Sequence, residues 1–267
     1  MSRIATTLEG VGRRGRAAVV PFITAGDPDL EVTRDCLRAL AEAGADLIEL
    51  GVPFSDPMAD GPVLQRSAAR ALESGTTLRR VLELVAEMQA ELAPPIVLFG
   101  YYNPIFRYGH ARFAADAATA GVAGTLCVDL PPEEATDLHA AVRSQDLDLI
   151  FLLAPTTPVA RVRRIGRLAT GFLYFVSVLG VTGARNQLPE DLPELVGRVR
   201  RVVDLPVAVG FGVQTAEQAA WVAGFADAVV VGSAIVGRIE DGPAGDAPRR
   251  VGDFVGGLIA AVRAAGR

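Results

Sequence analysis

The feature that most constrains the fold is an alternation of short apolar segments with longer amphipathic ones along the whole chain. Each short segment is too brief to be a buried helix, and several are bounded by Gly, Pro or Asp, which is typical of buried β-strands. The predicted strands are residues 18–24, 46–51, 96–101, 124–129, 148–154, 171–176, 206–212 and 228–232.

Between these strands, apolar residues recur at helical spacing. The predicted helices are residues 30–43, 63–91, 111–120, 133–144, 159–168, 191–202, 216–223 and 251–265. The long segment 63–91 is expected to be two helices, broken around Ser74-Gly75. Residues 4–12 are expected to form an extra N-terminal helix, and residues 241–248 a loop before the last helix.

Eight strand–helix units in 267 residues, with strands apolar on both faces, predict an α/β fold whose parallel sheet is covered by helices. An eightfold repeat at this length favours closure into a (β/α)8 barrel, or TIM barrel, over an open sheet. No linker or change in composition divides the chain, so residues 1–267 are expected to form a single domain. The helix at 4–12 is expected to cover the barrel floor.

The residue types that the chain lacks exclude several kinds of chemistry. All 26 basic residues are Arg, so the chain cannot form a Schiff base, hold pyridoxal phosphate covalently or build a P-loop. His110 and His139 are the only histidines, which excludes a three-histidine metal site, and we expect no metal. Cys36 and Cys127 lie far apart and are interpreted as buried thiols in a reducing compartment.

Charge and hydropathy narrow the possible partners. The formal net charge is −5, and the densest basic stretch, residues 161–167, has the spacing of a solvated helix face, so no nucleic acid is expected. No run of about 18 apolar residues exists, so no membrane span is expected. The first apolar run, residues 17–23, is followed by turn residues and not by a cleavage site, which predicts a cytoplasmic protein.

In barrels of this kind the chemistry lies at the carboxyl ends of the strands. Glu49 lies within the otherwise apolar second strand, where burial would raise its pKa and suit it to proton transfer; the alternative is a core carboxylate paired with an Arg. Asp60 follows in a loop, and its alternative role, shared by Asp56, is to cap the helix beginning at Gly61-Pro62. Two carboxylates around one strand end favour an acid–base site.

Glycines recur at the ends of the last three predicted strands. Residues 178–184 follow the sixth strand, Gly210-Phe-Gly212 ends the seventh, and Gly232-Ser233 ends the eighth. Glycine lets backbone N–H groups approach an anion, and a short helix beginning at Ser233 would favour negative charge at its N-terminus. Any one of these glycines could simply form a turn, but three adjacent strand ends indicate a phosphate site.

Together these residues indicate a phosphate-handling barrel enzyme that uses carboxylates. Without lysine, carbon–carbon cleavage requires a substrate that can itself hold the electrons of the breaking bond. Such a substrate must be protonated at the breaking carbon while a hydroxyl group loses its proton.

Residues 49–62, ELGVPFSDPMADGP, closely resemble the signature of the tryptophan synthase α subunit. The resemblance continues, in the family's order, through residues 21–28 (PFITAGDP), 102–104 (YNP), 129–132 (DLPP), 180–183 (GVTG), 210–212 (GFG) and 231–235 (VGSAI). Two places differ from familiar members. Val63 stands where threonine is common, and Val178-Leu179 where small polar residues are common.

The resemblance implies retro-aldol cleavage of indole-3-glycerol phosphate to indole and glyceraldehyde 3-phosphate. On the matching positions, Glu49 would protonate indole C3 and take the proton of the adjacent glycerol hydroxyl. Asp60 would accept a hydrogen bond from the indole nitrogen and stabilise the indolenine-like intermediate, which is the electron sink required above. Tyr174 matches an active-site tyrosine of the family.

The resemblance also implies where the substrate binds. Thr182 lies in the loop that, in the family, closes over the substrate and approaches Asp60. The phosphate would sit on backbone donors around Gly183, Gly212, Gly232 and Ser233. The indole would pack among apolar residues for which core packing is an equally good interpretation: Phe22, Leu64, Phe99, Leu126 and Phe211.

The family works as an αββα complex that passes indole to a pyridoxal-phosphate β subunit, which makes tryptophan with serine. The resemblance therefore implies a β partner, an interface near residues 53–58 and the 102–104 loop, and no cofactor on this chain. One alternative is a free-standing lyase that releases indole alone. Another is a non-catalytic barrel that only activates its partner, against which Glu49 and Asp60 argue. A sugar-phosphate isomerase would need a different constellation at strand two.

Overall fold

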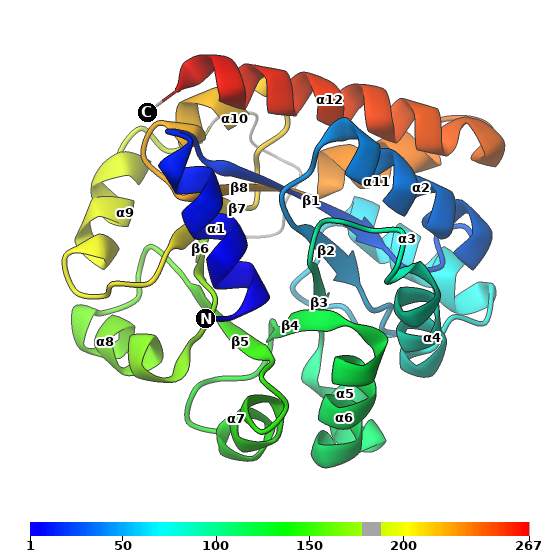
Figure 1. The fold of residues 1–267 in the computed structure, drawn as a ribbon, viewed down its shortest axis with the longest axis horizontal. Helices are drawn as coiled ribbons and strands as arrows, with labels where there is room; N and C mark the ends of the chain where they lie inside the picture. Colours follow the sequence, from blue (N-terminus) through cyan, green and yellow to red (C-terminus); the bar gives the residue numbers. More distant parts are fainter. Residues whose placement is uncertain (178–187, 267) are drawn as a thin grey trace.

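The computed structural model describes residues 1–177 and 188–266. Its strands form one closed barrel in which each strand pairs in parallel with the next and β8 pairs with β1, so the expected TIM barrel is confirmed (Figure 1). The strands are β1 (Ala18–Thr24), β2 (Ile48–Gly51), β3 (Ile96–Gly100), β4 (Val122–Cys127), β5 (Asp148–Leu153), β6 (Leu173–Val176), β7 (Val207–Gly210) and β8 (Ala228–Val231).

Helices surround the barrel and follow the strands in chain order (Figure 1). Those described are α1 (Arg3–Arg13), α2 (Leu30–Ala43), α3 (Pro62–Glu73), α4 (Leu78–Met88), α5 (Tyr102–Tyr108), α6 (His110–Ala120), α7 (Thr136–Arg143), α8 (Val159–Leu168), α9 (Leu192–Arg200), α10 (Ala216–Ala223), α11 (Ser233–Glu240), the 3-10 turn η1 (Ala244–Asp246) and α12 (Ala247–Ala265). Within the described residues, no helix is both long and apolar enough to cross a membrane.

The strands are apolar on both faces because each face packs against a different layer. Ile48 and Leu50 of β2 belong to the layer between the strands and the outer helices. Leu47, just before β2, belongs to the second layer, which fills the barrel interior. Since side chains alternate along a strand, Glu49 occupies an inward position, opposite Phe22 of β1. A carboxyl group therefore stands where the alternation demands an apolar side chain.

Helix α1 closes one end of the barrel. Its buried side chains Ile4, Leu8 and Val11 pack with the interior layer of the strands. Ser2 caps the helix by accepting a hydrogen bond from the Ala5 N–H at 3.2 Å. Figure 1 shows α1 lying across the barrel opening, which confirms the expected extra N-terminal helix.

Three local expectations have different outcomes. The break in segment 63–91 is confirmed, since α3 ends at Glu73 and α4 begins at Leu78. The expectation of a loop at 102–104 is wrong: these residues form the first turn of α5, where Pro104 needs no backbone N–H. The loop expected at 241–248 is also shorter, because α12 begins at Ala247.

Candidate active site

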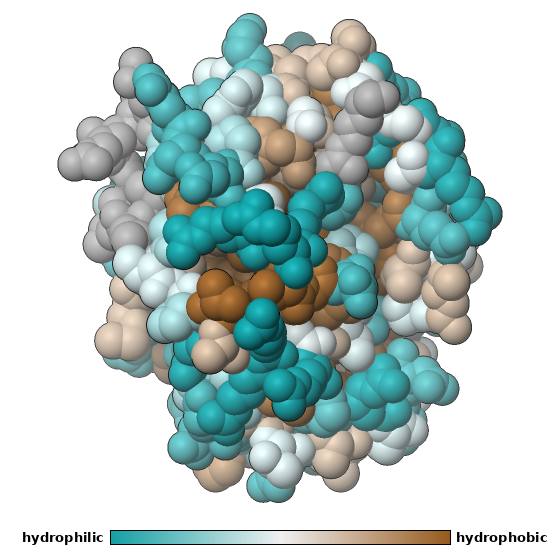
Figure 2. All heavy atoms as spheres, turned by 90° about the vertical axis from the view of Figure 1, so that its left-hand side faces the viewer, coloured by the Kyte–Doolittle hydropathy of each residue, from teal (hydrophilic) through white to brown (hydrophobic). Residues whose placement is uncertain are grey.

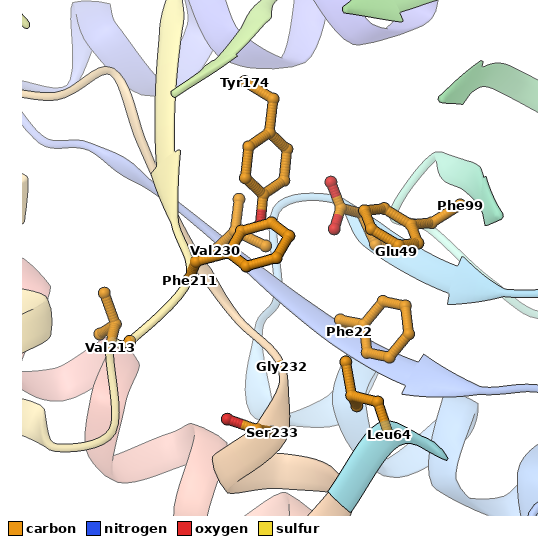
Figure 3. Close-up of a pocket in the computed structure, with 11 residues that line it drawn as sticks. Phe22, Glu49, Leu64, Phe99, Tyr174, Phe211, Val213, Val230, Gly232 and Ser233 are labelled. Carbon is orange, nitrogen blue, oxygen red and sulfur yellow. The ribbon is translucent and has the colours of Figure 1, made fainter. Parts of the chain in front are cut away.

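A pocket opens into the barrel and is bounded by carboxyl ends of strands and the segments that follow them. Figure 3 shows the Glu49 carboxyl at one end of the pocket, pointing toward Tyr174, and Ser233 at the other end. The ring of Phe22 lies between them. The lining residues are Phe22, Glu49, Leu64, Phe99, Tyr174, Phe211, Gly212, Val213, Val230, Gly232 and Ser233.

Glu49 is a buried carboxyl group without a partner. Its side chain is 1% exposed, and neither carboxyl oxygen has a hydrogen-bond partner among the described residues. Burial alone raises its pKa to about 8, because a carboxylate is poorly solvated in this apolar surrounding. The alternative of a core carboxylate paired with Arg is wrong for the part of the chain described. At neutral pH Glu49 therefore holds a proton that it can donate.

Asp60 lies in the loop between β2 and α3. The N-cap position of α3 is Gly61, without a side-chain capping bond, so Asp60 does not serve as the cap. Burial raises the pKa of Asp60 to about 6, while a hydrogen bond from the Tyr101 hydroxyl acts in the opposite direction. Tyr101 is itself held in place, since its hydroxyl accepts a hydrogen bond from the Ala59 N–H at 2.9 Å.

The two carboxyl groups differ in the way that acid–base chemistry requires. Four buried side-chain oxygens have no hydrogen-bond partner within the described residues, and three of them belong to Glu49 and Asp60. A carboxyl with a pKa of about 8 is protonated at pH 7, whereas one of about 6 is mostly ionised. Environments that push two pKa values apart in this way leave one group able to donate a proton and the other able to stabilise positive charge at the same pH.

Aromatic rings form the apolar wall of the pocket. The ring centroids of Phe22 and Phe99 lie 5.2 Å apart, edge to face, and Tyr174 and Phe211 meet in the same way at 5.6 Å. Phe99 and Tyr174 connect the two pairs, with centroids 6.4 Å apart. This wall suits a flat aromatic ligand, because edge and offset contacts add to the free energy of burying its surface.

The other end of the pocket offers backbone donors. Gly212 follows β7 with φ +90°, and Phe211 before it also has a positive φ, of +65°. The carbonyl of Phe211 accepts a hydrogen bond from the Ser177 hydroxyl, which holds this bend. Helix α11 begins at Ser233 without a side-chain cap. The Ile235 N–H donates to the Gly232 carbonyl at 2.8 Å, which leaves the N–H groups of Ser233 and Ala234 as the donors of the first turn available to an anion within the described residues.

The structure brings most of the residues predicted from sequence into this one pocket. Leu126 is an exception, because it lies buried in the barrel interior and does not line the pocket. Asp60 is also not among the residues that line the pocket, although Leu64, four residues further along the chain, does line it. Thr182 and Gly183 fall outside the described residues.

Sequence reasoning missed three residues at the site. Val213 and Val230 line the pocket, and Val230 could have been found from the strict alternation along β8, which turns it inward. Tyr101 contacts Asp60 although 41 positions separate them, and no local pattern predicts such a contact.

A second hollow lies between α8 and α9 and is lined mostly by apolar side chains, together with Thr157 and with Arg198 as its one charged residue. Figure 2 shows this side of the barrel, where a patch of apolar atoms is surrounded by hydrophilic ones. No carboxyl group lines it, so it offers no acid–base pair. Across residues 1–177 and 188–266, no group of three His, Cys, Asp or Glu side chains could hold a metal ion.

The fold and the site define a class: a TIM barrel with two buried carboxyl groups beside an aromatic pocket, into which the N-terminus of a short helix opens. Comparison with known proteins is more specific. A sequence model of the family "Tryptophan synthase alpha chain" matches residues 8–252. The tryptophan synthase alpha chain of Geotalea uraniireducens is 52% identical over 266 residues, covering 100% of both chains. That of Burkholderia thailandensis is 49% identical over 268 residues, 100% of this chain and 99% of the relative.

Solved structures agree with the sequence relatives. Tryptophan synthase of Mycobacterium tuberculosis superposes with a TM-score of 0.91 at 40% identity, covering 98% of both chains. Tryptophan synthase subunit alpha of Legionella pneumophila gives a TM-score of 0.90 at 38% identity, again covering 98% of each chain. The chain belongs to the tryptophan synthase alpha chain family.

Proposed function

We propose that Glu49 and Asp60 are the groups with which this chain cleaves indole-3-glycerol phosphate to indole and glyceraldehyde 3-phosphate, the lyase reaction of its family in tryptophan biosynthesis. The observation that carries the proposal is the Glu49 carboxyl, which lines an aromatic pocket, has no partner among the described residues and has a pKa of about 8. A buried, unpaired carboxyl group costs free energy of folding, and proton transfer to a substrate accounts for it.

Glu49 would act first as an acid and then as a base. In its protonated form it donates a proton to indole C3, which places a positive charge on the ring nitrogen. The resulting Glu49 carboxylate then takes the proton from the hydroxyl next to the breaking bond. The electrons of the carbon–carbon bond return to the indole ring, and the hydroxyl carbon becomes the aldehyde. The proton balance closes, because the proton gained by the ring equals the one lost by the hydroxyl.

Asp60 would stabilise the charge that this step creates. With a pKa of about 6 it is mostly ionised at neutral pH, so it can accept a hydrogen bond from the indole N–H as positive charge develops there. The free Oδ1 atom, buried and unpartnered within the described residues, is the acceptor available for that bond. The Tyr101 hydroxyl would hold the other side of the carboxylate.

The two ends of the pocket would bind the two ends of the substrate. The indole would lie against the aromatic wall of Phe22, Phe99 and Phe211, together with Leu64. The phosphate would bind at the first turn of α11 and at Gly212, where backbone N–H groups and the helix dipole favour an anion. Thr182 and Gly183 complete this proposal as closing-loop and phosphate residues on the strength of the sequence motif alone.

We also propose that this chain works with a β subunit, in an αββα assembly, and binds no cofactor of its own. The similarity to a tryptophan synthase complex of Pyrococcus furiosus, with a TM-score of 0.85 at 39% identity, supports a complex. Met58 and Phe106, 83% and 60% exposed, follow neighbouring strands and supply apolar surface for such a contact. Buried free thiols at Cys36 and Cys127 support a cytoplasmic location.

The experiment that tests this function is indole release from indole-3-glycerol phosphate by the full chain, with and without a tryptophan synthase β subunit. Slow release alone and a large increase with the β subunit are the expected results. Fast release without a partner would instead favour a free-standing lyase. No indole under either condition would contradict the proposal and leave a non-catalytic barrel.

A further inference from the structure

A network of charged side chains joins three segments around β1. Asp27, fully buried in the loop after β1, accepts two hydrogen bonds from Arg70 of α3, at 2.7 and 2.8 Å. The Ser67 hydroxyl donates to the same carboxylate at 2.5 Å. Glu240, the last residue of α11, accepts from Arg70 at 3.1 Å and from two nitrogen atoms of Arg66 at 2.8 Å.

The order of the barrel explains why these segments meet. β1 lies between β8 and β2, so the loop after β1 lies between α11, which follows β8, and α3, which follows the loop after β2. α3 and α11 pack directly against each other. Arg70 bridges both neighbours, because it holds the loop through Asp27 and α11 through Glu240.

The two helices joined by this network both begin at the substrate site. α3 begins two residues after Asp60 and carries Leu64, which lines the pocket. α11 begins at Ser233, at the phosphate end of the same pocket. Figure 3 shows the beginnings of both helices facing the pocket, with Leu64 on one and Ser233 on the other. The network ties together the later turns of these two helices, behind the site.

We propose that the network of Asp27, Arg70, Glu240 and Arg66 positions the phosphate end of the site relative to the Asp60 end. This inference rests on the proposed function, because it concerns a substrate that contacts both ends at once. A substrate that contacts both ends is held in reactive geometry only if α3 and α11 keep fixed positions relative to each other. A displacement of about 1 Å at one end can reduce the rate by about a hundredfold. Arg70 and Glu240 touch no substrate and are positioning residues.

Glu240→Ala is the variant that tests the proposal, since it removes the bridge to α11 and leaves the buried Arg70–Asp27 pair intact. A matched control is Glu133→Ala. Glu133 also pairs with two arginines, Arg161 and Arg164, and the side chains of Glu240 and Glu133 are 30% and 33% exposed. Ion pairs at this exposure contribute about 0–1 kcal/mol each, so both variants are expected to fold and melt alike by circular dichroism.

For indole-3-glycerol phosphate, kcat/KM is expected to fall about tenfold in Glu240→Ala and to change less than twofold in Glu133→Ala. Glu240→Gln, which keeps an acceptor for Arg70, is expected to lie between the unsubstituted chain and Glu240→Ala. Binding of inorganic phosphate, which contacts only one end of the site, is expected to stay within about twofold in all variants.

Two results would overturn the inference. One is an equal kcat/KM in Glu240→Ala and Glu133→Ala. The other is a loss of phosphate affinity as large as the loss in kcat/KM, which would make the effect local to α11. If the unsubstituted chain releases no indole, the proposed function fails, and the inference fails with it. If the unsubstituted chain releases indole and either of the two results above is obtained, only the inference fails. The two failures are therefore distinguishable.

Discussion

Glu49 is a carboxyl group at a strand position where its neighbours on the barrel interior are Leu, Val and Phe. Nothing in the described residues donates a hydrogen bond to it, and its burial away from water favours the neutral form. The same burial that makes it a proton donor near pH 7 makes it a cost to stability when it ionises. Function and stability are therefore opposed at this residue.

This opposition predicts how stability depends on pH. The pKa of Glu49 is raised from 4.5 to about 8 in the folded chain, so the folded state binds the proton more tightly than the unfolded state. The free energy of unfolding then decreases as pH rises from about 5 to 8, at up to about 1.4 kcal/mol per pH unit. Glu49→Gln cannot ionise, so its advantage over the unsubstituted chain should be near zero at pH 5 and a few kcal/mol at pH 8. Urea unfolding at both pH values measures this difference, and an advantage independent of pH would contradict the assignment.

Tyr101 provides a second prediction at the scale of single residues. Its hydroxyl hydrogen-bonds Asp60 and lowers the pKa of that carboxyl, which burial otherwise raises. Tyr101→Phe should therefore raise the pKa of Asp60 above about 6 and move the acid limb of the kcat/KM profile to higher pH, by about one unit. The basic limb, set by Glu49 near pH 8, should stay in place.

The control for this change is Tyr108→Phe. Tyr108 also donates a hydrogen bond to an aspartate, to Asp116 at 2.6 Å, but on the outer helices. Its removal should leave both limbs of the profile unchanged. If Tyr101→Phe moves neither limb, or both limbs equally, Asp60 is not the group that sets the acid limb.

At the scale of elements, the segment after β7 places both an aromatic ring and a backbone donor in the pocket. Gly212→Trp should raise KM for indole-3-glycerol phosphate at least tenfold, because a side chain there blocks the approach of the phosphate. Steady-state kinetics at saturating and limiting substrate measure this. Gly109→Trp is a matched control. Gly109 has φ +91° and Gly212 has φ +90°, so the backbone strain caused by tryptophan is similar at the two positions. A Cβ atom added at Gly109 would meet no atom within 4 Å. An unchanged KM in Gly212→Trp would place the phosphate elsewhere.

The elements could be predicted well where local physical rules decide them. α2, α8 and α10 have the predicted bounds because caps, glycines or prolines mark at least one of their ends. The strand β1 matches residues 18–24 because all seven of its residues are buried. α5 was missed because the Tyr-Asn-Pro sequence favours a turn, and only the structure shows Pro104 in the first turn of a helix.

The site could be predicted only in part, for a reason that belongs to the closed barrel. Strand ends could be recognised one by one, which was sufficient for Glu49, Gly212 and Ser233, whereas Tyr174 was identified from the family resemblance. Contacts between distant segments, such as Tyr101 with Asp60, depend on the packing of whole helices and loops. The strand that contains Leu126 could be predicted from the sequence, but the depth of the Leu126 side chain in the barrel could not.

At the scale of the whole molecule, the exposed loop after β2 predicts a partner contact. Met58→Glu should leave the slow cleavage by this chain alone unchanged and raise the β-subunit concentration needed for half-maximal stimulation by about tenfold. The reason is that it places a charge on an apolar side chain that is 83% exposed. Titration of indole release with the β subunit measures the shift.

Val159→Glu is the control, because Val159 is also an exposed apolar residue but lies on α8, away from the loop after β2. It should behave like the unsubstituted chain in the same titration. Equal titrations for Met58→Glu and the unsubstituted chain would remove the loop after β2 from the interface.

The central claim is that Glu49 moves the proton, and single-turnover release of indole from indole-3-glycerol phosphate by Glu49→Gln tests it most directly. The amide keeps the shape of the side chain but cannot donate an acidic proton or accept one from the hydroxyl. The rate should fall by about a hundredfold or more, while substrate binding is retained. A rate near that of the unsubstituted chain would contradict the mechanism and leave the buried carboxyl without a function.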